Sequence, residues 1–255
     1  MKGETDDRPQ TGRAGLVRAV ERARRRAIYE AKTLVAQHPA MALPVARRRH
    51  GFVVERGSDI VIEGFPRSAN TFAHAAFVSA QPESIRAAGR VHAPAQIIAA
   101  VRWGIPAIVL IRHPEDVVPS FLIRHPQTGV RQAMRGWLRF YVPLVRYLDR
   151  VVVAPFDRVT TDFGAVIQQV NGRFGTTFAP FEHTEESVAA VWASIDSDYR
   201  TRVGAGSEFD RIVARPSEGR ERLREEATAK YRDAELTEAR ARLRSVWERF
   251  VRAAG

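Results

Sequence analysis

Short apolar runs alternate with amphipathic stretches through the middle of the chain. Three runs have the composition of buried strands: 59–63, 106–111 and 150–154. Apolar residues at helical spacing predict helices over 69–79, 94–103, 114–123, 132–148 and 163–174. Pro119 predicts a kink or an early end within the third of these helices. The alternation of strands and helices predicts an α/β fold, with a parallel β-sheet flanked by helices.

Both ends of the chain have helical patterns. Residues 14–37 carry Leu, Val and Ala at helical spacing with arginines among them, and Pro39 and Pro44 are expected to end this helix. Residues 217–253 have the pattern of one long charged helix. The predicted parts are a basic N-terminal helical extension, 1–50, and an α/β domain with a helical C-terminal part, 51–255.

Composition narrows the class of protein. The chain has 255 residues, of which 45% are hydrophobic and 27% charged, as in a soluble globular protein. It contains no cysteine, which excludes disulfides, thiolate metal ligands and a cysteine nucleophile. The N-terminus lacks the continuous apolar core of a secretory signal, so we expect a cytoplasmic protein, with peripheral membrane contact as a further option.

The positive charge is concentrated near the N-terminus. The net charge is +11, and residues 1–50 hold 12 Lys and Arg against 5 Asp and Glu. A basic helix of this kind could bind nucleic acid, but aromatic residues would then be interleaved with the basic ones, and the helix offers only Tyr29. Nucleic acid is therefore not the favoured partner. Two uses stay open for residues 14–37: contact with an anionic membrane surface, or, as we favour, packing on the domain through the Ala/Leu/Val stripe.

The segment Gly64–Thr71 lies between a predicted strand and a predicted helix. Backbone N–H groups at a helix start lack internal partners, and the helix dipole favours an anion there. A Walker A loop would have the pattern G-x-x-x-x-G-K-S/T, and this segment lacks the second Gly and the Lys. A kinase-like nucleotide enzyme therefore remains an alternative only if its phosphate site is unorthodox.

A second polar element, running from Arg112 to Ser120, directly follows the predicted strand 106–111. Arg112 at the end of that strand and Ser120 about two helical turns along could clamp one phosphate. The alternative is structural: Arg112 would pair with Asp116, and the Ser120 hydroxyl would bond to its own helix. Between the two elements lies His92, whose neutral imidazole suits proton transfer near pH 7.

Three segments together resemble those of sulfotransferases that use 3′-phosphoadenosine 5′-phosphosulfate (PAPS). Pro66-Arg67-Ser68-Ala69-Asn70-Thr71 is similar to the family's phosphosulfate loop, P-K/R-S-G-T-T. The stretch from Arg112 to Ser120 matches every fixed position of R-x-P-x-D-x-x-x-S, and Arg90-Val-His-Ala-Pro94 shares His and Pro with K-T-H-x-P. The resemblance covers about 59–175 and implies a P-loop-like sulfotransferase fold.

The resemblance also implies roles for these residues. Pro66, Arg67, Ser68, Ala69, Asn70 and Thr71 would bind the 5′-phosphosulfate, and Arg112 and Ser120 the 3′-phosphate. His92 would be the general base, and Arg67 would stabilise charge electrostatically during in-line transfer of the sulfuryl group to a hydroxyl or amine. Phe156 would lie near the adenine, and Arg215 or Arg220 would complete the 3′-phosphate site.

Further expectations concern the loop and its ligands. Because Ala69 stands where the family has Gly, we expect the backbone at position 69 to avoid a positive φ. PAPS would be the donor and PAP the product, and no metal is required, since no His or carboxylate cluster has metal-ligand spacing. The acceptor stays open between a small molecule, a carbohydrate and a lipid, and the pattern does not predict an oligomeric state.

Overall fold

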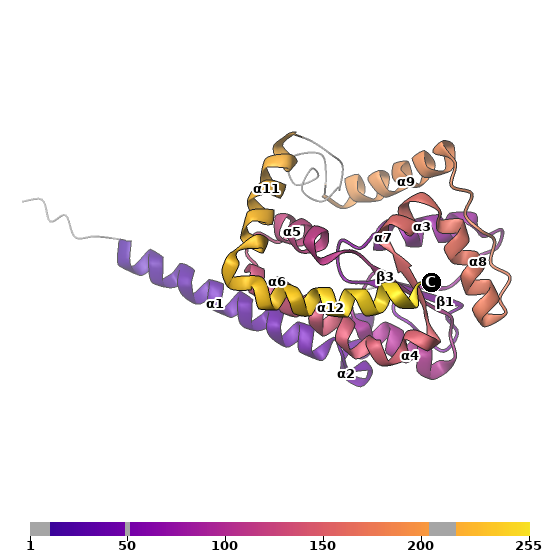
Figure 1. Ribbon diagram of the computed structural model, residues 1–255, viewed down its shortest axis with the longest axis horizontal. Coiled ribbons are helices and arrows are strands. Elements are labelled where there is room, and N and C mark those ends of the chain that lie inside the picture. The colour runs from indigo at the N-terminus through magenta and orange to yellow at the C-terminus, as the bar shows by residue number, and fades with distance from the viewer. Residues whose placement is uncertain (1–10, 49–51, 204–217) are drawn as a thin grey trace, which may run out of the picture.

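The computed structural model of the chain describes residues 11–48, 52–203 and 218–255, and its centre is a four-stranded parallel sheet (Figure 1). The strands lie in the order β2-β1-β3-β4, and each neighbouring pair is parallel. Their bounds are β1 Ile60–Gly64, β2 Ala87–Gly89, β3 Ala107–Ile111 and β4 Val152–Pro155. The predicted α/β class, with a parallel sheet flanked by helices, is confirmed.

Strand β2 was not predicted from the sequence. Its residues, Ala-Ala-Gly, carry none of the β-branched or aromatic side chains that mark strands. The small residues allow a close approach to β1 instead, since a Cβ on Gly89 would lie 2.0 Å from the Ile62 carbonyl oxygen. The strand matters to the site because the chain that leaves its carboxyl end carries His92.

Alternate strand residues face two separate apolar cores. Ile60 and Ile62 point to one face of the sheet and Val61 to the other, as the period of two in a strand requires. The first face is covered by α3 Asn70–Ala80, α7 Phe156–Thr161, α8 Phe163–Phe174 and α9 Glu185–Val203. The second is covered by α4 Pro94–Trp103, α5 Pro114–Arg124, α6 Val130–Tyr141, the 3₁₀ helix η1 Val142–Arg150 and α12 Thr237–Ala253. Helix α11 Glu218–Arg232 packs on α5.

Three helix boundaries differ from the prediction. Pro39 starts a second helix, α2 Pro39–Arg47, instead of ending the helical region, because proline is suited to the first turn of a helix. The predicted helix 132–148 is divided into α6 and the 3₁₀ helix η1, whereas α5 ends at Arg124, close to its predicted end, without a break at Pro119. The long C-terminal helix is interrupted by a short 3₁₀ turn, Ala234–Leu236, which Asp233 caps by accepting a hydrogen bond from the Glu235 N–H.

Helix α1 Thr11–Val35 packs on α6, but through a different side of the helix from the one that we predicted. Its contacts to α6 come from the side that carries Tyr29 and Glu30, and Figure 1 shows the N-terminal half projecting from the body. The apolar stripe that we expected to pack on the domain is exposed: Leu16 is 66% and Leu34 48% exposed. No helix among the described residues has the length and apolar character needed to cross a membrane.

Candidate functional site

The predicted site residues meet at one edge of the sheet, where all four strands end. The loop after β1 carries Arg67, Arg112 follows β3, Phe156 follows β4, and His92 follows β2. Carboxyl ends of parallel strands form one edge, and ligands of α/β proteins bind at that edge. A cavity of about 860 Å³ lies there, and residues from the loop and from α1, α5, α6, α9 and α11 also line it.

The loop between β1 and α3 has two residues in the left-handed region: Arg67 at φ 75° and Ala69 at φ 66°. The expectation that position 69 avoids a positive φ was wrong. Ala69 is the N-cap of α3 and offers no side-chain acceptor, so the first N–H groups of the helix have no partner within it. The Asn70 amide nitrogen donates to the Phe65 carbonyl 3.0 Å away, which closes the loop. The loop therefore keeps the geometry of a Gly-containing turn at the cost of backbone strain.

We expect Ala69→Gly to stabilise the protein by about 1 kcal/mol, because glycine relieves the left-handed strain. Thermal unfolding would show this as a melting temperature raised by about 2–4 °C. The matched reverse variant is Gly104→Ala, at a residue with φ 71° and open space around it, and it should lose about the same amount. A lower melting temperature for Ala69→Gly would contradict the strain at this position.

The two phosphate elements predicted from the sequence are in direct contact. Arg67 Nε donates to Ser120 Oγ at 3.1 Å, and Arg112 Nη1 donates to the Arg67 carbonyl at 3.3 Å. Asp116, the structural partner considered for Arg112, forms its ion pair with Arg224 of α11 at 3.2 Å. The loop, the β3 end and α5 thus present two guanidinium groups and a hydroxyl at one place.

Phe156 lies beside Arg112. The Arg112 guanidinium carbon is 4.0 Å from the centre of the Phe156 ring, a cation–π contact that orients the arginine. Phe156 is the first residue of α7 and also lines the cavity. Its contact with adenine stays a prediction, and Arg215 lies outside the described residues.

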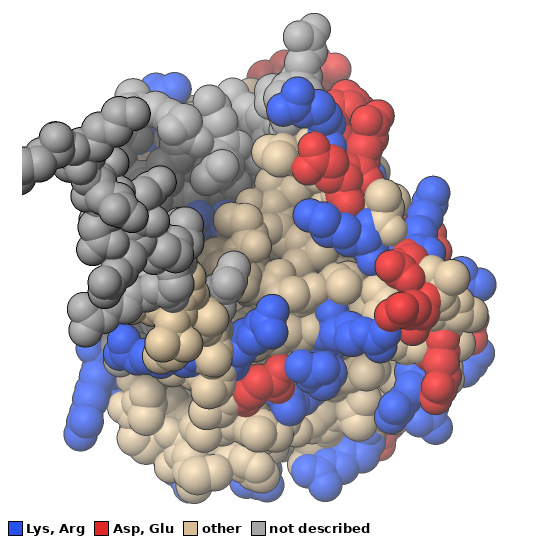
Figure 2. Space-filling model, turned by 90° about the vertical axis from the view of Figure 1, so that its left-hand side faces the viewer, with Lys and Arg blue, Asp and Glu red and all other residues tan. Residues whose placement is uncertain are grey.

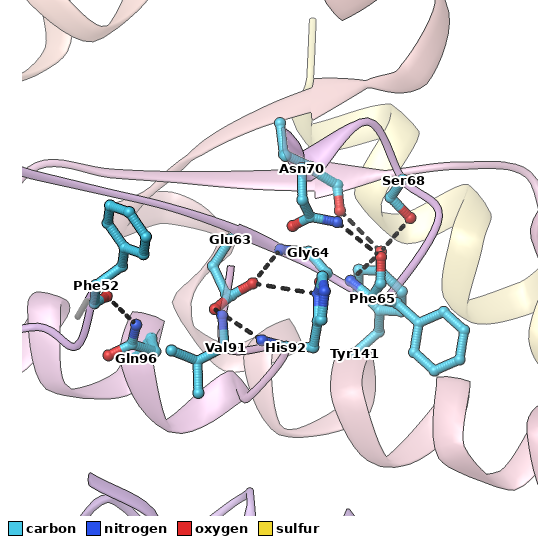
Figure 3. Close-up of polar contacts among 11 residues, drawn as sticks. Phe52, Glu63, Gly64, Phe65, Ser68, Asn70, Val91, His92, Gln96 and Tyr141 are labelled. Atoms are coloured by element: carbon cyan, nitrogen blue, oxygen red, sulfur yellow. Dashed lines mark hydrogen bonds and ion pairs between the residues drawn. The ribbon is translucent and has the colours of Figure 1, made fainter. Parts of the chain in front are cut away.

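Ser68 is the loop residue that turns away from the cavity. It is fully buried, and its hydroxyl lies 3.5 Å from that of Tyr141 in α6. Tyr141 donates to the Leu110 carbonyl at 2.8 Å and accepts from the Phe65 N–H at 3.3 Å, as Figure 3 shows in part. One phenol hydroxyl therefore ties the loop to the end of β3.

Tyr141→Phe should lower the free energy of unfolding by about 1–3 kcal/mol, because it leaves buried partners of the hydroxyl unpaired. Urea denaturation would measure the loss. Tyr147→Phe is the matched control. Tyr147 is half-buried in η1, the helix after α6, and loss of its hydroxyl should change stability little. Equal effects of the two substitutions would show that the Tyr141 hydroxyl does not support the loop.

His92 is held by backbone groups and by the buried carboxyl group of Glu63. It has φ 59°, and its N–H and that of Val91 both donate to Glu63 Oε2 at 3.0 Å (Figure 3). The ring Nδ1 lies 3.0 Å from the Gly64 carbonyl oxygen. Because a carbonyl oxygen can only accept, Nδ1 carries the proton, and Nε2 keeps its lone pair.

The electrostatics of this pair favour an uncharged imidazole. Removal from bulk water lowers the pKa of His92 to about 4, and the nearby Lys32 and Arg90 act in the same direction. Burial raises the pKa of Glu63 to about 8, although the backbone N–H donors oppose the shift. The His92 side chain is nevertheless 36% exposed and lines the cavity, so a ligand can reach it.

Several residues of the site were not singled out from the sequence: Glu63, Tyr141, His125, Lys32 and Arg224. Burial lowers the pKa of His125 to about 4, with Arg124, Arg67 and Lys32 nearby. The only signal for Glu63 was its position at the end of a strand; the others are placed by long-range packing. Within the described ranges no group of three His, Asp or Glu side chains is arranged to hold a metal.

Similarity to known proteins is found among solved structures. No protein-family model and no curated protein sequence matches the chain. Among solved structures, the mouse sulfotransferase SULT7A1 complexed with PAP aligns with a TM-score of 0.42 and 13% identity, over 77% of this chain and 89% of that one. We therefore infer function from the geometry of the cavity.

Proposed function

We propose that this protein is a PAPS-dependent sulfotransferase. The observation that carries the proposal is the meeting of Arg67, Arg112 and Ser120 at the carboxyl edge of the sheet, beside the start of α3. A loop that binds a single phosphate at a helix start requires only one anion-binding element. Here a second element, at the end of β3, contacts the first, and together they offer enough donors for a ligand with more than one anionic group.

The lining residues fit such a nucleotide. The N–H groups at the start of α3 and Arg67 would hold the 5′-phosphosulfate, and Arg112 with Ser120 would hold the 3′-phosphate. Arg224 reaches the cavity from α11 and is a candidate for a further phosphate ligand. PAPS, when bound, supplies the sulfuryl group. We keep the cytoplasmic location and the lack of a metal requirement as parts of this proposal.

The chain's own residues would act on the acceptor and on the developing charge. His92 Nε2 accepts the proton of the acceptor hydroxyl, and the Glu63 network fixes the ring for that role. Arg67 stabilises negative charge by a charge-assisted contact and keeps its own proton. Small-molecule, carbohydrate and lipid acceptors are all compatible with this chemistry.

A thermal-shift comparison separates this proposal from a kinase-like enzyme. PAP should raise the melting temperature by several degrees at saturating concentration, because a ligand that binds only the folded state stabilises it. ATP with Mg²⁺ should have much less effect, since the loop lacks the Walker Lys. The reverse order of the two shifts would favour the kinase-like alternative over a sulfotransferase.

A further inference from the structure

An exposed apolar stripe runs along the two N-terminal helices. In α1, exposed Leu, Val and Ile side chains are linked by the exposed Ala23, Ala27 and Ala31, and α2 adds two more large apolar side chains at its surface. The large exposed members are Leu16 (66%), Val17 (63%), Val20 (59%), Ile28 (55%), Leu34 (48%), Met41 (50%) and Val45 (54%). We call these seven residues the N-terminal stripe. Single exposed apolar residues are ordinary, but a continuous set is typical of an interaction surface.

Polar contacts fix α1 so that this stripe faces outward. Glu30 forms ion pairs with Arg135 and Arg139 of α6, and Arg139 also donates to Thr33 Oγ1 at 2.8 Å. Gly136 makes room for the Tyr29 hydroxyl, since a Cβ there would lie 2.2 Å from it. The helix therefore packs on α6 through Tyr29, Glu30 and Thr33 and leaves the N-terminal stripe exposed to solvent.

The exposed side of these helices is also basic. Arg24 is exposed, Arg25 has a 58% exposed side chain, and Arg47 on α2 is 48% exposed. Glu21 is the one exposed acid among the described side chains of α1 and α2, and it pairs with Arg25. Figure 2, which looks from the side on which α1 projects, shows Lys and Arg side chains among tan ones over the lower part of this face.

We propose that the N-terminal stripe docks on an anionic lipid bilayer. Apolar side chains flanked by arginines match the apolar and anionic layers of a membrane surface, which a helix lying in the interface contacts together. A second copy of the chain is a poorer match, because its own stripe carries the same positive charge and would repel the first.

The stripe continues into the rim of the cavity. Ile28 belongs to the stripe, and both Ile28 and Arg25 line the cavity. A membrane bound at the stripe would therefore lie beside the opening through which an acceptor enters. Resting on the proposed function, this position indicates that the acceptor is a hydroxyl carried by a lipid.

Vesicle co-sedimentation of the full chain tests the docking surface. Wild type should bind vesicles in which about a third of the lipid is phosphatidylserine, and bind pure phosphatidylcholine vesicles several-fold less. The double variant Leu16→Glu/Val20→Glu should reduce binding about tenfold or more, and both positions are too exposed for the change to unfold the protein. Val78→Glu, at an apolar residue that is 41% exposed in α3, is the control and should bind as wild type.

Light scattering on the same proteins tests the alternative, in which a second copy of the chain covers the N-terminal stripe. A wild-type dimer that the double variant converts to a monomer, without vesicle binding, would overturn the proposal in favour of a second copy. Vesicle binding that the double variant leaves unchanged would overturn it as well. PAP titrations of the double variant should match those of wild type, so loss of docking and loss of the proposed nucleotide function are distinguishable.

Discussion

Replacement of Arg112 with alanine should weaken PAP binding about a hundredfold in isothermal calorimetry. A charge-assisted contact to phosphate contributes about 1.5–3 kcal/mol, and each 1.4 kcal/mol is about tenfold in affinity. The substitution also removes the hydrogen bond to the Arg67 carbonyl and the contact with the Phe156 ring, so the neighbouring groups lose part of their orientation.

Two further variants make this result specific. Arg112→Lys should fall between wild type and alanine, because lysine keeps the charge and loses the planar fork. Arg131→Ala is the charge-matched control: Arg131 pairs with Glu235 at the surface and does not line the cavity. If Arg112→Ala folds normally and binds PAP as wild type does, the 3′-phosphate assignment is wrong.

Replacement of His92 with alanine should reduce the rate of sulfuryl transfer and leave PAP binding nearly unchanged, in contrast to Arg112→Ala. PAP affinity should stay within a few-fold of wild type, while sulfuryl transfer to an identified acceptor falls about 10²–10⁴-fold, the usual contribution of a general base. A large loss of PAP affinity would indicate that His92 serves to hold the loop.

The pH dependence gives a second test of His92. Its pKa is lowered to about 4, so the ring is uncharged, and able to accept a proton, at every pH well above that value. The kcat/KM of wild type should be level from neutral pH downward and should fall only as the pH approaches 4. A fall centred near the ordinary histidine pKa of about 6.5 would contradict the neutral, desolvated base.

The sequence predicted the elements whose pattern is local. Strand 106–111 and helices 94–103 and 163–174 were found almost to the residue. The strand is a continuous apolar run, Pro94 marks the start of the first helix, and Gly175 marks the end of the second. Strand β2 escaped because Ala-Ala-Gly has no periodicity, and its pairing depends on close approach to β1. The break at Asp233 was a missed capping signal.

The candidate site residues predicted from the sequence lie next to strand ends. Arg67 is far from Arg112 and Ser120 in sequence, and the parallel sheet brings them into contact. Tyr141 and Glu63 could not be found in this way, since each acts through tertiary contacts: one hydroxyl under the loop, and one carboxylate under His92. The left-handed Ala69 shows that a loop can keep its shape without the residue type that usually allows it.

Calorimetric titration of wild-type protein with PAP, and separately with adenosine 5′-phosphate, tests the central claim most directly. The two ligands differ by the 3′-phosphate, the group assigned to Arg112 and Ser120. We predict micromolar binding of PAP and binding of adenosine 5′-phosphate that is about a hundredfold weaker. No binding of PAP, or equal binding of the two nucleotides, would contradict a sulfotransferase site.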